Sequence, residues 1–270
     1  MAEHAIAERL LYRLIRRHIA GTTMSSAIEK ARELNDRKLP VSIAFLSESA
    51  HDSTKARYAT TTYLELIRRI ARLGLKASIQ VPLDQIGFDI SDEVAEKNVN
   101  EILTTARNYG VFVWLEIRDH RSALPAFLQE AKGVGYAVSI DRSEDYIREN
   151  RGQIKAIKML CAEAHGDGKD AGKRVLGRVK SATRLVKNAV VQSAPETALR
   201  SLLNGSGMKK SIIFELQLGY SGKKMSMIVK RGGRVSVYIP FGKDWEHYAV
   251  SRTPERYARF LATRILKEAR

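Results

Sequence analysis

Short segments rich in valine and isoleucine alternate with helical segments along most of this chain, and that alternation constrains the fold more than any other feature. We predict eight strands, at residues 39–47, 75–81, 111–117, 136–140, 154–160, 189–192, 211–218 and 235–239. Helices are expected between them and at the end, at residues 55–73, 91–109, 122–132, 143–150 and 169–187, from 195, and at 253–269. Alternating strands and helices are typical of parallel sheets, because a crossover between parallel strands needs a long connection. Eight such units predict an α/β fold, a (β/α)8 barrel of the TIM type.

Residues 1–270 are expected to form a single barrel domain, in which residues 1–37 supply N-terminal helices. A doubly wound open sheet is the alternative, since the number of strands does not show whether the sheet closes. No Gly-x-Gly-x-x-Gly motif follows a predicted strand, which argues against a dinucleotide-binding fold.

The chain is strongly basic, with 46 Lys and Arg against 30 Asp and Glu, a formal net charge of +16. The basic residues are scattered except over residues 169–187, where they surround an amphipathic helix. A solvated helix face is the preferred interpretation of this segment. Contact with nucleic acid or with an anionic membrane surface is the alternative.

The remaining composition indicates a soluble chain in a reducing compartment. The single cysteine, Cys161, excludes a disulfide framework, and no apolar run reaches the roughly 18 residues of a membrane span. The six histidines lack the spacing of a zinc site, so no metal is expected. We therefore expect a cytoplasmic protein, with a peripheral position at a membrane as the alternative.

Polar residues interrupt the apolar strands at or near their carboxyl ends, where the active sites of such barrels lie. They are Glu48, Gln80, Glu116, Ser139, Lys155, Lys158, Gln192, Ser193, Glu215, Gln217 and Tyr238. Because polar groups in an apolar strand are costly unless they are paired, these residues should line a ligand cavity. The alternative is that some of them cap the barrel ends or pair with one another.

The last predicted strand and helix bring Tyr238 and Arg252 to one place, and a guanidinium there suits a small carboxylate. This segment resembles the C-terminal signature of the proline dehydrogenase family, a strand ending in Tyr-x-Pro followed by Tyr-x-x-Arg-Arg and then Glu. Tyr238-Ile-Pro240, Tyr248, Arg252 and Glu255 match it, whereas Ser251 replaces the first arginine.

Further motifs that are similar to that family follow in the same order along the chain. They are His18-Ile-Ala-Gly21-Thr22, Leu46-Ser-Glu48, Ser78-Ile-Gln80, Lys155-Ala-Ile-Lys158 and Phe214-Glu215-Leu216-Gln217-Leu218. Only the motifs of the last two strands are specific. The others gain weight from their order.

The resemblance implies a distorted barrel that holds FAD against the strand ends and oxidises proline to pyrroline-5-carboxylate. Hydride passes to the flavin, and the electrons then pass to a quinone or another acceptor. By the same resemblance, Arg252 and Glu255 would bind the substrate, Tyr238 and Leu218 would wall its ring, and Lys155 and Glu116 would be catalytic. Cofactor contacts would come from Lys155, Lys158, Glu215 and Gln217.

Several family positions are changed in this chain. Gln80 or Pro82 stands where the family has a lysine, Ser193 lies near the position of its histidine, and Ser251 leaves a single guanidinium. A related small or cyclic amino acid is therefore an alternative substrate. A flavin-free barrel with a structural or regulatory role is an alternative function.

Overall fold

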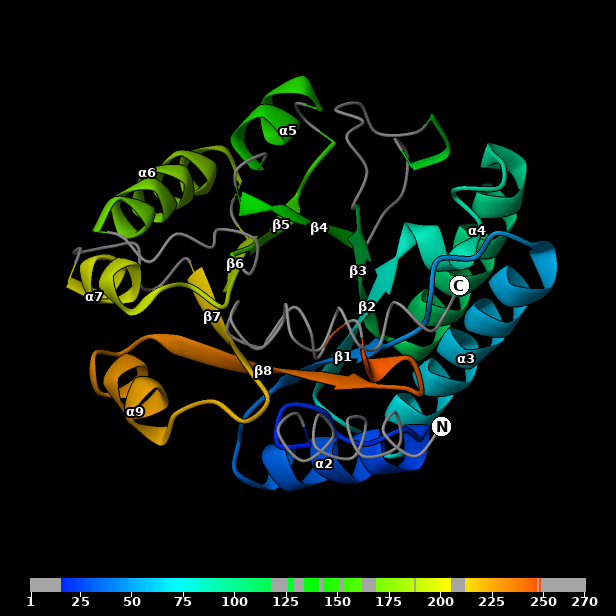
Figure 1. Ribbon diagram of the computed structural model, residues 1–270, viewed down its shortest axis with the longest axis horizontal. Coiled ribbons are helices and arrows are strands. Elements are labelled where there is room, and N and C mark those ends of the chain that lie inside the picture. Colours follow the sequence, from blue (N-terminus) through cyan, green and yellow to red (C-terminus); the bar gives the residue numbers. More distant parts are fainter. Residues whose placement is uncertain are drawn as a thin grey trace, which may run out of the picture.

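The computed structural model describes residues 16–117, 126–128, 134–140, 143–150, 153–161, 169–186, 188–204, 212–246 and 248. Its strands close into a barrel in the order β1 to β8 (Figure 1). Every neighbouring pair is parallel, including β8 with β1, and this closure excludes the open doubly wound sheet. The strands are β1 (Val41–Phe45), β2 (Ala77–Pro82), β3 (Phe112–Glu116), β4 (Val134–Ser139), β5 (Ala156–Leu160), β6 (Asn188–Gln192), β7 (Ile212–Gln217) and β8 (Arg234–Phe241).

The helices lie around the outside of the barrel (Figure 1). They are α2 (Met24–Asp36), α3 (Ser53–Arg72), α4 (Asp92–Tyr109), α5 (Ser143–Glu149), α6 (Lys169–Leu185), α7 (Glu196–Asn204) and α9 (Gly222–Lys230), with short 3-10 turns η1 (Leu83–Ile86) and η2 (Ala126–Leu128). The predicted helix 253–269 and most of the predicted helix 122–132 lie outside the described residues. The assignment of residues 1–270 to one domain therefore stays a prediction, although the barrel itself runs from β1 to β8.

Local sequence signals explain where the long helices begin and end. The Asp52 side chain accepts from the Lys55 backbone N–H before α3, and the Ser91 hydroxyl accepts from the Val94 backbone N–H before α4. Helix α4 ends at Gly110, whose φ of 69° is left-handed. No helix was predicted over α9. Its first turn contains no acidic residue and its N-cap forms no side-chain hydrogen bond, so the usual start signals are missing.

Two layers of side chains pack against the strands because each strand is buried on both faces. The larger layer fills the space between the barrel and its helices, and the buried Val175, Val179 and Ala182 of α6 take part in it. The smaller layer lies inside the barrel and includes Trp114 and Leu160. The middle of the barrel interior is polar, and this feature positions the candidate site. In the described part of the chain, no helix is long and apolar enough to cross a membrane.

Candidate active site

The register of the strands places one polar residue after another on the inner wall of the barrel. Gln217 pairs with Tyr238, which pairs with Ser42, and Gln192 pairs with Glu215, which pairs with Ser236. Alternate residues of a strand point to opposite faces, so these partners share the interior face. Side chains that lie far apart in the sequence therefore meet inside the barrel.

Lys158 occupies the centre of this interior and is completely buried. Its ammonium lies 2.9 Å from Ser42 Oγ, 2.9 Å from Gln80 Oε1, and 3.1 Å and 3.0 Å from the two carboxylate oxygens of Glu215. Burial lowers the pKa of Lys158 from its usual value, and the Glu215 charge acts in the opposite direction. Such a cation is tolerated in an apolar fold only because its hydrogen bonds are made by the surrounding strands.

Further hydrogen bonds extend this contact into a network that we call the central network. Gln80 Nε2 donates to Glu116 Oε2 over 2.6 Å, Gln192 Nε2 donates to Glu215 Oε2 over 2.6 Å, and the Ser236 hydroxyl lies 3.3 Å from Glu215 Oε1. Every strand except β4 contributes a residue. The network holds two carboxyl groups against one ammonium, and its members fix one another's orientation.

The β4 side of the interior is occupied by an aromatic ring instead. Gly135 of β4 lies against Trp114, and a Cβ atom at Gly135 would come within 2.3 Å of the indole. The Lys158 ammonium is 5.0 Å from the centroid of the Trp114 ring. The absence of a side chain at Gly135 thus makes room for an aromatic face beside the buried cation.

The carboxyl end of β7 carries a second set of polar contacts. Gln217 Nε2 donates to Ser193 Oγ over 2.8 Å, and the Tyr248 hydroxyl donates to Gln217 Oε1 over 2.6 Å. Ser193 has a φ of 61°, an unusual conformation for a residue other than glycine. The buried Leu218 and Tyr238 lie beside this set, joined by a backbone hydrogen bond of 2.9 Å.

The segment before α2 is hydrogen-bonded to the same end of the barrel. The Ala20 backbone N–H donates to Pro240 O over 2.9 Å, Gly242 donates to Gly21 O over 3.1 Å, and His18 Nδ1 lies 2.8 Å from Leu218 O. Gly242 has a φ of 146°, and a Cβ atom there would lie 2.2 Å from Leu46 O. The sequence motifs at residues 18–22, 46–48, 214–218 and 238–240 are therefore neighbours in space.

The structure brings together six of the nine predicted site residues in two adjoining groups. Leu218, Gln217 and Tyr238 lie at the carboxyl end of the barrel. Glu116, Lys158 and Glu215 belong to the central network. Arg252 and Glu255 lie outside the described residues.

Lys155 is not brought to either group. It precedes the first residue of β5 and its side chain is exposed, so it lies at the amino end of the barrel. Lys155 lies three residues before Lys158, and three residues along a strand reverse the face to which a side chain points. The prediction of Lys155 as a catalytic and cofactor residue is therefore not retained.

Sequence reasoning missed Ser42, Trp114 and Ser236. Ser42 and Ser236 are small polar residues in the middle of otherwise apolar strands, and that position was the available signal. Trp114 carried no such signal, because an aromatic residue in a strand can face either layer.

Comparison with known proteins confirms the resemblance inferred from the motifs. Proline dehydrogenase 1 of Bacillus subtilis (strain 168) is 27% identical over 275 residues, which cover 94% of this chain and 91% of that protein. Proline dehydrogenase of Deinococcus radiodurans is 22% identical, with coverages of 97% and 93%. No family model matches the chain.

Solved structures show the same fold. Proline utilization A (PutA) from Corynebacterium freiburgense superposes with a TM-score of 0.67 at 13% identity, covering 97% of this chain and 33% of that one. PutA from Bdellovibrio bacteriovorus, inactivated by N-propargylglycine, gives a TM-score of 0.65 at 14% identity, covering 93% and 34%. The chain thus spans about a third of the length of these PutA chains, and the likeness establishes the barrel architecture.

Proposed function

We propose that this protein, whose sequence resembles proline dehydrogenases over most of its length, oxidises L-proline or a related small or cyclic amino acid with FAD as cofactor. The observation that carries the proposal is the 27% identity to Bacillus subtilis proline dehydrogenase 1 over 94% of the chain. It is supported by the spatial meeting of the resembling motifs at the carboxyl end of the barrel, where such enzymes place their chemistry.

The residues at the carboxyl end fit a flat ring that has a polar edge. Leu218 and Tyr238 are each only 7% exposed and would supply a small apolar wall. The half-buried Gln217 amide, which is bonded to Ser193 and Tyr248, would supply the polar edge. FAD held there would accept the hydride that the substrate loses.

We assign the central network a supporting role toward the cofactor. The polar atoms of Lys158 and Glu215 bond to network partners, and both side chains are almost fully buried. They would act by holding Gln80, Gln192 and Glu116 in place and by setting the electrostatic potential beneath the ring.

Substrate recognition is assigned to Arg252 and Glu255, with Tyr238 and Leu218 enclosing the ring. Arg252 would bind the carboxylate, Glu255 would orient the guanidinium, and Glu116 would face the amine. Because Ser251 supplies no second guanidinium, we expect proline to bind roughly ten- to a hundredfold more weakly than to a site with two.

The proposed reaction is a two-electron oxidation of proline. Proline loses a hydride from the ring carbon Cδ and a proton from nitrogen, and a carbon–nitrogen double bond forms to give pyrroline-5-carboxylate. Bound FAD would accept the hydride, and a quinone or another acceptor would then take up the two electrons.

Purification of the protein, followed by assay of flavin content and of proline-dependent reduction of a quinone analogue, tests the proposal. A yellow protein that forms pyrroline-5-carboxylate from L-proline supports it. A protein that stays colourless after incubation with FAD would instead favour the flavin-free barrel.

A further inference from the structure

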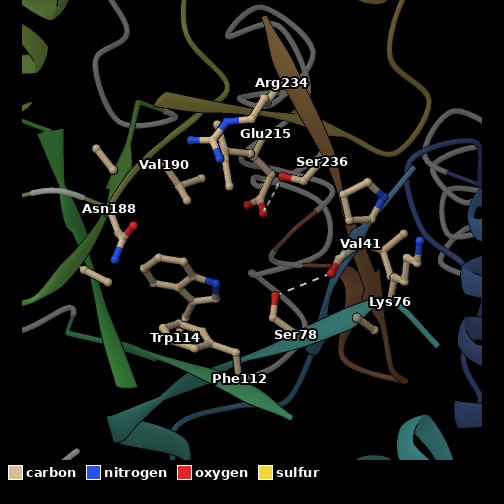
Figure 2. A pocket seen from close by; sticks show the side chains of 15 residues that line it. Val41, Lys76, Ser78, Phe112, Trp114, Asn188, Val190, Glu215, Arg234 and Ser236 are labelled. Carbon is tan, nitrogen blue, oxygen red and sulfur yellow. Dashed lines mark hydrogen bonds between the residues drawn. The ribbon is translucent and has the colours of Figure 1, made fainter. Parts of the chain in front are cut away.

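A cavity of about 320 Å³ lies among the amino ends of the strands, opposite the candidate active site. Figure 2 shows the side chains that line it. Its rim is formed by residues at the amino ends of the strands, including Lys76, Phe112, Asn188 and Arg234. Its volume lies within the range of pockets that hold small organic ligands.

The cavity exists because the interior positions near this end carry small or displaced side chains. Ser78 and Ala156 point into it from β2 and β5. The Trp114 indole packs against Gly135 and therefore lines one side of the cavity without filling it. The hollow is therefore specified by the sequence.

One side of the cavity is aromatic and apolar. The Phe112 and Trp114 rings meet edge to face with centroids 5.0 Å apart, and Val190 and Ile213 continue this surface. Phe112 is 37% exposed, so an aromatic edge is presented to a ligand that enters. Burial of a ligand's apolar body against it would be favourable, because apolar surface is removed from water.

The rim of the cavity is positively charged. Arg234 and Lys76 are both exposed, and neither forms an ion pair with any residue in the part of the chain that the structure describes. Figure 2 shows Arg234 across the cavity from Trp114. A guanidinium with unused donors suits a carboxylate.

The residues at the floor of the cavity do not counteract this preference for a carboxylate. Glu215 and Ser236 line it, but the Glu215 carboxylate is bonded to the Lys158 ammonium. The Glu215 charge at the floor is thus compensated, and Glu116, the second carboxyl group of the central network, is not among the lining residues. Both charges at the rim are positive.

We propose that this amino-end cavity is a second binding site, which takes a small carboxylate with an aromatic or branched apolar body. The body lies against Trp114 and Phe112, and the carboxylate binds Arg234. The site is separate from the carboxyl end of the barrel and does not depend on the function proposed there.

Phenylacetate and its neutral analogue phenylacetamide serve as matched probes, with affinities measured by calorimetry and the Trp114 indole followed by NMR. Phenylacetate is expected to bind at least about tenfold more tightly than the amide and to shift the Trp114 signal. Arg234→Gln should abolish that preference, whereas Arg231→Gln, an exposed arginine that does not line the cavity, should preserve it.

A second variant fills the cavity itself. Ser78 is half-buried and lines the cavity, so Ser78→Phe places a ring inside it and should prevent binding of both probes. Circular dichroism checks that the variant folds. The proposal is overturned by equal affinities for the two probes, by an unmoved Trp114 signal at saturation, or by displacement of phenylacetate with L-proline.

Discussion

The two ends of the barrel are built in different ways. At the carboxyl end, backbone hydrogen bonds from Ala20 and Gly242 join the segment before α2 to the end of β8 and the residue after it, and the Gln217 amide is bonded on both sides. At the amino end, exposed side chains such as Phe112 and Arg234 surround an open cavity. The central network separates the two.

This difference indicates different tasks. Groups held by several hydrogen bonds keep the fixed geometry that catalysis requires. A rim of exposed side chains can adapt to a ligand but does not align reacting atoms. On the functions that we propose, chemistry would take place at the carboxyl end and binding at the amino end.

The largest effect on stability is expected from removal of the buried Lys158 ammonium, which lies between the two ends of the barrel. Lys158→Met leaves Glu215 buried without its cation, which should lower the free energy of unfolding by about 3–5 kcal/mol in urea denaturation. Lys155→Met is a matched control on the same chain segment. Because Lys155 is exposed, its loss should change stability by no more than about 0.5 kcal/mol.

The double variant Lys158→Met with Glu215→Leu sharpens this test. Removing both charges should recover part of the lost stability, since a buried pair can be replaced by apolar residues at little cost. Equal stability of the two single lysine variants would contradict the central network.

A smaller effect is expected at the carboxyl end alone. Arg252→Ala should raise the apparent KM for proline by about ten- to a hundredfold, because a charge-assisted hydrogen bond to the carboxylate is lost, while bound flavin stays unchanged. Ser251→Arg should lower KM. If KM does not respond to Arg252→Ala, the substrate carboxylate is bound elsewhere.

An effect of comparable size is expected next to the amino-end cavity. Gly135→Ala introduces a Cβ atom against the Trp114 ring, which should destabilise the protein by about 1–3 kcal/mol and shift the indole. Gly177→Ala is the control, since nothing lies within 4 Å of a Cβ atom at that exposed position of α6. It should be neutral or stabilising by up to about 1 kcal/mol. Similar losses at both glycines would argue against a tightly packed Trp114.

Much of the fold follows from the sequence because strands with apolar side chains on both faces, and helices with clear caps, carry local signals. The Ser91 cap of α4 is one such signal. Helix α9 was missed because its start has no side-chain cap. The Lys224 side chain in its first turn donates instead to Ala194 O, 30 residues away in the sequence.

The candidate site was harder to predict, since pairing between strands depends on register. The polar residues at Gln80, Glu116, Lys158, Gln192 and Glu215 were recognised. Whether they would face a ligand or one another could not be read from the strands one at a time. Their mutual hydrogen bonds show that pairing is the outcome for this group.

Anaerobic titration of the FAD-loaded protein with L-proline tests the central claim most directly. If the carboxyl end carries proline oxidation, the visible absorption of oxidised flavin should disappear with one equivalent of proline consumed per flavin, and phenylacetate should not prevent it. A flavin that dithionite reduces but excess L-proline leaves oxidised would contradict the account.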